Sequence, residues 1–445
     1  MPHVFRAAWV LPIAGPPIRD GWVAVDGGLI VALGGPDDEA PGSSNTQRAT
    51  SEPSNEAASR SDAASPKGAR ERSERDARGG GAPRALSNAI LPGLVNAHTH
   101  LEFSYAHRRV PPSERFGDWI RGVMAMRRGY PDPDAPEILT AARDAIRDAR
   151  ASGTALVGDI SNTLVTVPLL REAGLAARVF YELIGFSVPD PEARVTAARE
   201  RVDALAGDDE VRISLAPHAP YSVSPPLFAA LRADIDAHPD ARSSVHLSES
   251  PDEVEFVRHG TGDIRVTLEE LGVWTDQWRA VLPAGTSPVG YLSKLGFLDR
   301  SVLAVHGVQF DDEDLARLYS LGSTIVTCPR SNRHVGAGDP PIERFYASGV
   351  RVAVGTDSLA SVEDLNVFHE LAAMRRLAPS VPAAVLLESA TKMGADALGF
   401  GDELGTIEPG KHAALIAVRI PPDLTDVEEY LVGGIEAADI AWLTE

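Results

Sequence analysis

Short, mostly apolar segments recur along the sequence between helix-like stretches, and this alternation constrains the fold more than any other feature. The intervening stretches, such as ILTAARDAIRDARASG and EARVTAARERVDALAG, have helical periodicity. Strands that alternate with helices predict parallel βα units, and eight of them favour an α/β fold, the closed (β/α)8 TIM barrel. The predicted strands lie in ILPGLVNAHTH, ALVGDIS, ARVFYELIG, VRISLAPHAPYS, RSSVHLSES, VLAVHGV, TIVTCPRSN and RVAVGTDS.

The two ends of the sequence have a different pattern. WVAVDGGLIVALGG places Gly-Gly between two apolar runs, which predicts a β-hairpin, and GTIEPGKHAALIAVRIPP returns to short strands and turns. We expect both ends to pair in a small β-sandwich domain beside the barrel. The expected boundaries are 1–35 and 88–92 for its N-terminal part, 93–399 for the barrel and 400–445 for its C-terminal part.

Residues 36–87 are rich in Ser, Ala, Gly, Pro, Arg and Glu and contain hardly a large apolar residue. This composition predicts a disordered insertion. A basic interaction arm is the alternative, but glutamate and aspartate balance the arginines there.

Composition indicates a cytoplasmic protein. Cys328 is the only cysteine, which excludes disulfides within the chain and a thiolate metal cluster. The N-terminal residues resemble no export signal, and no run of about 18 apolar residues predicts a membrane span. A net charge of −21 disfavours nucleic acid and anionic membranes as partners. Oligomeric state stays open, and a homo-oligomer is compatible with the sequence.

Histidines gather at the ends of the predicted strands. In His98-Thr99-His100 the alternation of a strand points both imidazoles to one side, into the barrel mouth. Imidazole and carboxylate suit one divalent ion such as Zn²⁺ or Fe²⁺, and three histidines with one aspartate leave a position for water. A bound ion can lower the pKa of that water to about 7. The other polar residues at predicted strand ends are His218, His246, His306 and Asp357.

Two further features bear on mechanism. Glu249 follows His246 in HLSES, where a carboxylate can shuttle protons between water and substrate. A second metal bridged by a carboxylated lysine is disfavoured because no lysine falls on a predicted barrel strand. The lysines are Lys67, Lys294, Lys392 and Lys411.

These motifs together resemble the amidohydrolase superfamily, in its nucleobase and nucleoside deaminase and chlorohydrolase branch. The family's strand motifs are similar to LPGLVNAHTHLEFS, LAPHAPYSVS, HLSES, VHGV, TCPRSN and VGTDSLAS. Its closing segment is similar to GTIEPGKHAALIAV, although the family usually has an acidic residue where His412 stands. The resemblance implies a deaminase with a catalytic Glu249 and His306 and with His218 contacting substrate. It implies these metal ligands: His98, His100, His246 and Asp357.

Within that branch, NAHTHLEFS and RFGDWIRGVMAMRR resemble the aminodeoxyfutalosine deaminases of menaquinone biosynthesis. The implied substrate is 6-amino-6-deoxyfutalosine, whose benzoate Arg330 would bind unless it forms a structural salt bridge. Asp118, beside Trp119, would accept hydrogen bonds from ribose or serve only as a helix-start acid. Glu102 and Phe103, directly after the histidine pair, would line the pocket.

Other functions stay open at this point. The nearest are deamination of adenosylhomocysteine, methylthioadenosine, guanine or cytosine, and release of chloride as in triazine hydrolases. A barrel that has lost catalysis and serves as a scaffold is an alternative of another class. Reaction products separate the enzymes from each other. A purified protein without stoichiometric metal that stays inert after metal reconstitution would favour the scaffold.

Overall fold

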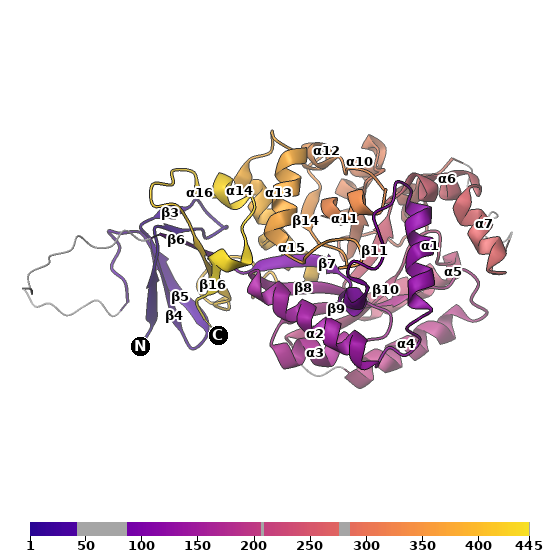
Figure 1. Ribbon diagram of the computed structural model, residues 1–445, viewed down its shortest axis with the longest axis horizontal. Helices are drawn as coiled ribbons and strands as arrows, with labels where there is room; N and C mark the ends of the chain where they lie inside the picture. The colour runs from indigo at the N-terminus through magenta and orange to yellow at the C-terminus, as the bar shows by residue number, and fades with distance from the viewer. Residues whose placement is uncertain (42–86, 206–208, 276–284, 445) are drawn as a thin grey trace, which may run out of the picture.

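The computed structural model describes residues 1–41, 87–205, 209–275 and 285–444 (Figure 1). Most of the predicted insertion, residues 42–86, lies outside the described residues. Two groups of β-strands organise the rest, one at the ends of the chain and one in its middle. Among the described residues, none of the helices is both long enough and apolar enough to cross a membrane.

All eight strands predicted for the middle of the chain are present, in two parallel four-stranded sheets. Their side chains are almost entirely buried, as expected of parallel strands covered on both faces. In the order of pairing, one sheet is β10 (Val211–Pro217), β9 (Ala176–Leu183), β8 (Thr154–Ser161) and β7 (Leu94–Thr99). The other is β11 (Ser243–Leu247), β12 (Val302–His306), β13 (Thr324–Thr327) and β14 (Arg351–Val354).

Backbone hydrogen bonds join the two sheets at both edges. His246 N donates to His218 O at 2.9 Å beside β10 and β11, and Asp357 N donates to His98 O at 3.0 Å beside β14 and β7. The carboxyl ends of strands from both sheets therefore meet at the same place.

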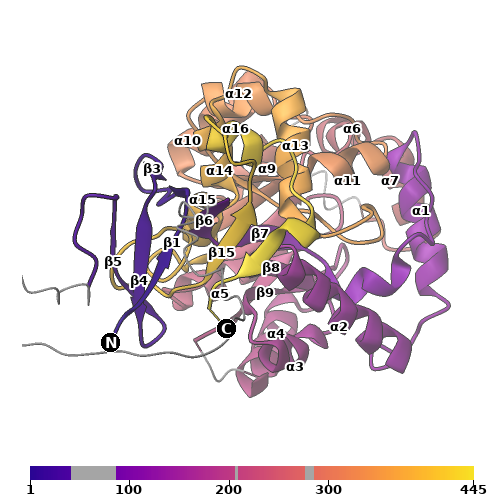
Figure 2. The same cartoon turned by 60° about the vertical axis from the view of Figure 1, so that its left-hand side comes forward.

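Helices connect the strands and surround them (Figures 1 and 2). Several begin at residues that cap the first turn; the Ser250 hydroxyl, for example, accepts from Glu253 N at the start of α6. The α-helices that follow β7 among the described residues are α1 (Phe116–Arg127), α2 (Pro136–Ala151), α3 (Thr166–Ala173), α4 (Pro191–Leu205), α5 (Pro225–Ala237), α6 (Pro251–His259), α7 (Asp263–Glu270), α9 (Pro288–Lys294), α10 (Asp312–Leu321), α11 (Pro329–His334), α12 (Ile342–Ala347), α13 (Val367–Leu377), α14 (Ala383–Ser389), α15 (Lys392–Leu398) and α16 (Val427–Leu431).

The two ends of the chain pair with each other, as predicted. β15 (Leu415–Arg419) lies antiparallel between β6 (Asn88–Pro92) and β16 (Ile440–Trp442), and β6 continues to β2 (Trp9–Val10) and β3 (Ile18–Arg19). Figure 2 brings these strands forward.

A second, three-stranded sheet contains the predicted hairpin. β4 (Trp22–Asp26) pairs antiparallel with β5 (Leu29–Gly34) and with β1 (His3–Arg6). Gly27 and Gly28 have φ of +58° and +79°, the conformation that glycine adopts most readily in a tight hairpin.

Candidate metal centre and active site

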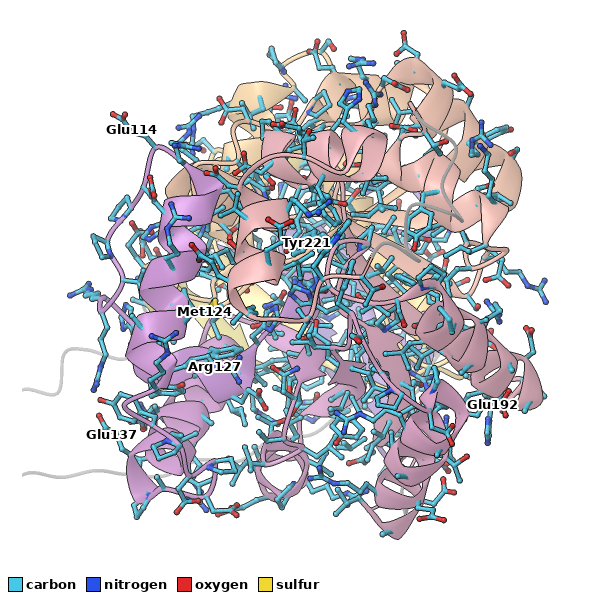
Figure 3. All side chains as sticks on the ribbon, turned by 90° about the vertical axis from the view of Figure 1, so that its right-hand side faces the viewer. Glu114, Met124, Arg127, Glu137, Glu192 and Tyr221 are labelled. Carbon is cyan, nitrogen blue, oxygen red and sulfur yellow. The ribbon has the colours of Figure 1, made fainter. Side chains whose placement is uncertain are left out.

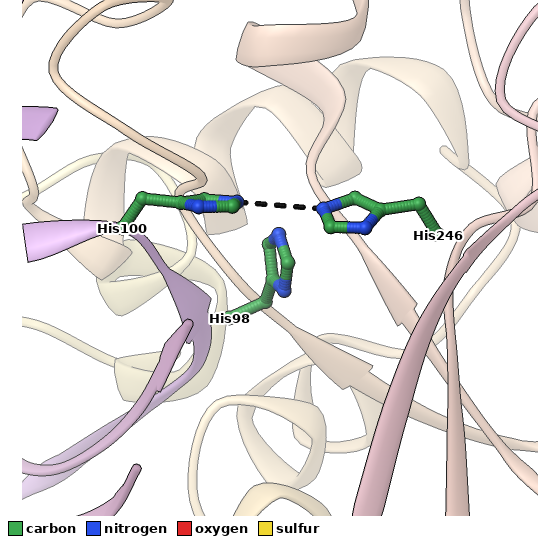
Figure 4. Close-up of side chains that lie close together, drawn as sticks. All are labelled: His98, His100 and His246. Carbon is green, nitrogen blue, oxygen red and sulfur yellow. Dashed lines mark hydrogen bonds between the residues drawn. The ribbon is translucent and has the colours of Figure 1, made fainter. Parts of the chain in front are cut away.

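The candidate metal centre lies where the parallel strands end. His98 is on β7 with His100 just beyond it, His246 is on β11, and Asp357 follows β14. The three imidazoles converge from different directions, as Figure 4 shows. One ligand atom from each of the three histidines lies within 4.8 Å of the others.

The distances suit a single ion. His100 Nε2 lies 3.4 Å from His246 Nε2, and Asp357 Oδ1 lies 3.5 Å from His100 Nε2 and 3.9 Å from His98 Nε2. Lone pairs directed at one point repel unless a cation lies between them. Among the described residues, these donors form a candidate site for one divalent metal ion.

Two observations test the fit of an ion. Both ring nitrogens of the fully buried His98 lack a hydrogen-bond partner among the described residues, which is costly unless another group satisfies them. His246 Nδ1 bonds to the carbonyl oxygen of His218 at 2.9 Å, so Nδ1 carries the proton and Nε2 keeps its lone pair. Both arrangements fit metal ligation.

The charge states also fit. Burial lowers the pKa of His246 to about 4 and holds the pKa values of His98 and His100 well below the ordinary value, so each imidazole is neutral at neutral pH and keeps one nitrogen lone pair. Burial raises the pKa of Asp357 to about 6, despite the hydrogen bond from Ser331. A cation is the partner that would stabilise this buried carboxylate.

Beside these donors lies a second pair of functional groups. Glu249 Oε1 is 3.7 Å from His306 Nε2, and Asn332 Nδ2 donates to His306 Nδ1 at 3.0 Å, which leaves the imidazole proton on Nε2. Burial, together with the charge of Asp357, holds the pKa of the Glu249 carboxyl well above its ordinary value. The raised pKa favours the protonated carboxyl, the form from which Glu249 can donate a proton.

The backbone is strained at this site. Ser248, His306 and Asp357 have φ of +52°, +75° and +62°, although none is glycine. At the neighbouring Gly355, a Cβ would lie 2.7 Å from His98 Cβ and 2.8 Å from His98 N. Close packing against β7 therefore requires glycine in the VGTDS motif.

A cavity of about 550 Å³ opens above these groups. Its floor contains His100, His218, His246, Glu249, His306 and Asp357. Its wall is largely apolar and includes Phe103, Trp119, Phe116, Met124, Phe186 and Leu268. An apolar cavity with a polar floor suits a small heterocyclic ligand.

Three predicted substrate contacts lie elsewhere. Glu102 is buried and accepts hydrogen bonds from the hydroxyls of Ser161 and Thr163, at 2.7 and 2.6 Å. Asp118 is exposed and pairs with Arg121. None of Glu102, Asp118 and Arg330 is among the described residues that line the cavity.

Arg330 matches the alternative weighed for it from the sequence, the structural salt bridge. Its Nε donates to Glu370 Oε1 at 2.7 Å and its Nη1 to Asp364 Oδ1 at 3.0 Å. Glu370 lies in α13, and Asp364 lies in the segment just before it. The guanidinium of Arg330 therefore fixes α11 against α13.

Sequence reasoning missed Glu182, at the end of β9. Its Oε1 lies 3.5 Å from His246 Nδ1, and its Oε2 accepts from Asn162 Nδ2 at 2.8 Å. It also missed Glu253, whose carboxylate accepts from the backbone nitrogens of Ser248 and Glu249. A carboxylate within the apolar run FYELIG, near the carboxyl end of a predicted strand, is the signal that points to Glu182.

Comparisons with known proteins agree with this site. The model of a family described as the amidohydrolase family matches residues 89–437. The aminodeoxyfutalosine deaminase of Deinococcus radiodurans is 33% identical over 327 residues, covering 70% of this chain and 73% of that protein. The 5-methylthioadenosine/S-adenosylhomocysteine deaminase of Moorella thermoacetica is 31% identical over 366 residues, covering 79% and 78%.

A solved structure is similar over nearly the whole chain. An adenosine deaminase from Xanthomonas campestris, solved with bound zinc, has a TM-score of 0.75 at 25% identity and covers 98% of this chain and 90% of its own. The family model spans both the parallel strands and the site described above. The chain therefore belongs to the amidohydrolase family.

Proposed function

We propose that the protein is a zinc-dependent hydrolytic deaminase of adenosine-type nucleosides and that its substrate is 6-amino-6-deoxyfutalosine. One observation carries the deaminase assignment: three histidines and Asp357 converge beside Glu249 and His306 on the floor of a largely apolar cavity. The relatives named as deaminases and the zinc-bound adenosine deaminase support it. Iron(II) is the alternative ion, since the same donors serve both metals.

In this proposal His98, His100, His246 and Asp357 hold the ion. When bound, zinc would polarise a water molecule and lower its pKa toward about 7. Glu249 takes a proton from the attacking water and gives it to the ring nitrogen beside the amino-bearing carbon. The new C–O bond replaces the C–N bond, and ammonia leaves with the second proton of the water.

The remaining polar groups assist. His306 carries its proton on Nε2, facing Glu249, and stabilises the charge that develops at the attacked carbon's oxygen. Asp357 helps to deliver the proton to the departing ammonia, and His218 contacts the substrate from the floor of the cavity. Phe103 and Trp119 form the apolar wall against which the ligand packs.

The substrate assignment rests on the Deinococcus radiodurans relative and on the sequence motifs around β7 and α1. A second candidate is 5-methylthioadenosine or S-adenosylhomocysteine, which the Moorella thermoacetica relative favours. These substrates share the purine and the ribose, so the floor of the cavity serves all of them, and the choice lies with the group attached at the far end of the ribose.

We also propose that the two parallel sheets form one closed (β/α)8 barrel over residues 93–399. Hydrogen bonds at both sheet edges support this. The terminal sheets would then form a small β-sandwich from residues 1–35, 88–92 and 400–445. Residues of both sheets, including Val10, Val23 and Leu415, share one buried hydrophobic cluster, which supports this arrangement.

A substrate panel tests the proposed function. Zinc-loaded protein is incubated with 6-amino-6-deoxyfutalosine, 5-methylthioadenosine, S-adenosylhomocysteine, adenosine, guanine and cytosine, and ammonia and product mass are measured. We expect the highest kcat/KM with 6-amino-6-deoxyfutalosine. A higher value for another nucleoside replaces the substrate, and no ammonia from any compound overturns the deaminase assignment.

A further inference from the structure

Arg127 places a positive charge at the wall of the cavity. It is half-buried near the end of α1 and lies on the same helix face as Ile120 and Met124, which also line the cavity. Figure 3 labels Arg127 and Met124 on this helix. Its guanidinium carbon lies 4.5 Å from the centroid of the Phe103 ring, and that centroid is 5.8 Å from the His100 ring. The Phe103 ring therefore lies between the Arg127 guanidinium and His100 of the candidate metal centre.

This charge is unpaired, unlike its neighbours. Arg121 pairs with Asp118, and Arg115 pairs with Asp263 at 2.7 Å. Within the described ranges, no carboxylate lies within 4.0 Å of the Arg127 guanidinium, which stacks instead on the Phe103 ring. The protein carries a net charge of −21, so an unpaired arginine beside an apolar cavity is unusual.

The charge also reaches the floor of the cavity. After burial, the positive charge of Arg127 is the second cause of the lowered pKa of His218, whose value is about 4. Arg127 also lowers the pKa of Glu182, though burial raises that pKa overall. A group bound between floor and wall would therefore be exposed to this field.

We propose that Arg127 binds a carboxylate carried by the substrate on the side of the ribose remote from the purine. The guanidinium can donate two parallel hydrogen bonds to one carboxylate, and its stacking on Phe103 orients it at little entropic cost. The apolar wall beside it accommodates an aryl group. Arg127 thereby selects nucleosides with an aryl carboxylate over neutral ones, an inference that rests on the proposed function.

The first test uses the unaltered protein. 6-Amino-6-deoxyfutalosine and its carboxyl methyl ester are compared as substrates of the zinc-loaded enzyme. We expect kcat/KM for the free acid to exceed that for the ester by roughly 10- to 100-fold, mostly through KM, since a hydrogen-bonded charge pair is lost. Equal values for acid and ester overturn the role of Arg127, whereas no turnover of either, with 5-methylthioadenosine still deaminated, overturns the proposed substrate instead.

The second test assigns the preference to Arg127. In Arg127→Met, the ratio of kcat/KM for the acid to kcat/KM for the ester should fall to about one, because the charge pair that distinguishes the two compounds is lost. Arg127→Lys should restore part of the preference. The matched control is Arg128→Met, next in sequence but exposed and outside the cavity lining, which should leave the acid preference unchanged. An acid preference that persists in Arg127→Met overturns the proposal.

Discussion

Ser331 donates a hydrogen bond from its hydroxyl to Asp357 Oδ2 at 2.6 Å. The other carboxylate oxygen, Oδ1, accepts from Ser358 N at 2.8 Å and faces His100 Nε2. The hydroxyl of Ser331 thus fixes the orientation in which Oδ1 points at the candidate metal position. A contact that orients a metal ligand in this way typically strengthens metal binding, because the ligand atom is already aimed at the ion.

Ser331→Ala should therefore weaken zinc binding by about 10- to 100-fold, because the Asp357 carboxylate loses the contact that orients it. Competition with a chromophoric chelator measures the affinity. Ser320→Ala is the matched control, since that hydroxyl donates only to a carbonyl oxygen within the exposed face of α10. Equal zinc affinity in Ser331→Ala and the unaltered protein would contradict the positioning role.

Glu249→Gln should keep its zinc but lose turnover by about 10²- to 10⁴-fold, because an amide cannot shuttle a proton. Metal analysis of the purified variant and its kcat with 6-amino-6-deoxyfutalosine check both parts. Glu255→Gln, an exposed change on α6, should behave as the unaltered protein. Substantial activity in Glu249→Gln would remove Glu249 from the mechanism.

Zinc affinity should fall as the pH falls through about 6. Burial raises the pKa of Asp357 to that value, so its carboxylate becomes protonated there, whereas His246, with a pKa of about 4, stays neutral. Chelator competition between pH 7.5 and 5 measures the dependence. Asp357→Asn should bind zinc more weakly but lose the dependence in this interval. The same fall in both proteins would assign the titration to another group.

Zinc should stabilise the fold, because it satisfies one of the two buried ring nitrogens of His98, which has no hydrogen-bond partner among the described residues. At a free zinc concentration one thousand times the dissociation constant, the expected gain is about 4 kcal/mol. Thermal unfolding with and without a chelator measures it. His98→Asn should abolish the zinc-dependent rise in Tm, and His238→Asn, at the exposed end of α5, should retain it. A rise that persists without His98 would place the ion elsewhere.

The strands and the convergence of the histidines could be predicted from sequence because both are local patterns. An apolar run of strand length is recognisable alone, and parallel strands bring their carboxyl ends to one edge, so His98 and His246 meet although other elements separate them. The hairpin at Gly27-Gly28 was predictable for the same reason.

The partners of long charged side chains could not be predicted in this way. Arg330 meets Glu370 and Asp364, which are 40 and 34 residues distant, and only the packing of α11 against α13 brings them together. Likewise, only the course of α1 over the cavity decides that Arg127 faces inward while Asp118 faces solvent. Residue type and sequence position carry no such information.

Arg330→Met should destabilise the protein without changing substrate preference. The Glu370 carboxylate, fully buried, would lose its cation, and breaking a buried pair in this way costs about 3–5 kcal/mol. Burial already raises the pKa of Glu370 to about 7 despite Arg330, and without Arg330 it should rise further. Since a raised carboxyl pKa costs stability where the unfolded state is ionised, the loss should be larger at pH 8 than at pH 5.

Urea unfolding at both pH values measures this loss, and kcat/KM for 6-amino-6-deoxyfutalosine and its methyl ester measures the preference. Arg333→Met is the control on the same helix: its pair with Asp339 is exposed, so its loss should cost at most about 1 kcal/mol. A variant Arg330→Met that kept full stability but lost the preference for the free acid would move carboxylate recognition from Arg127 to Arg330. The two arginines are therefore separable because one should change stability and the other selectivity.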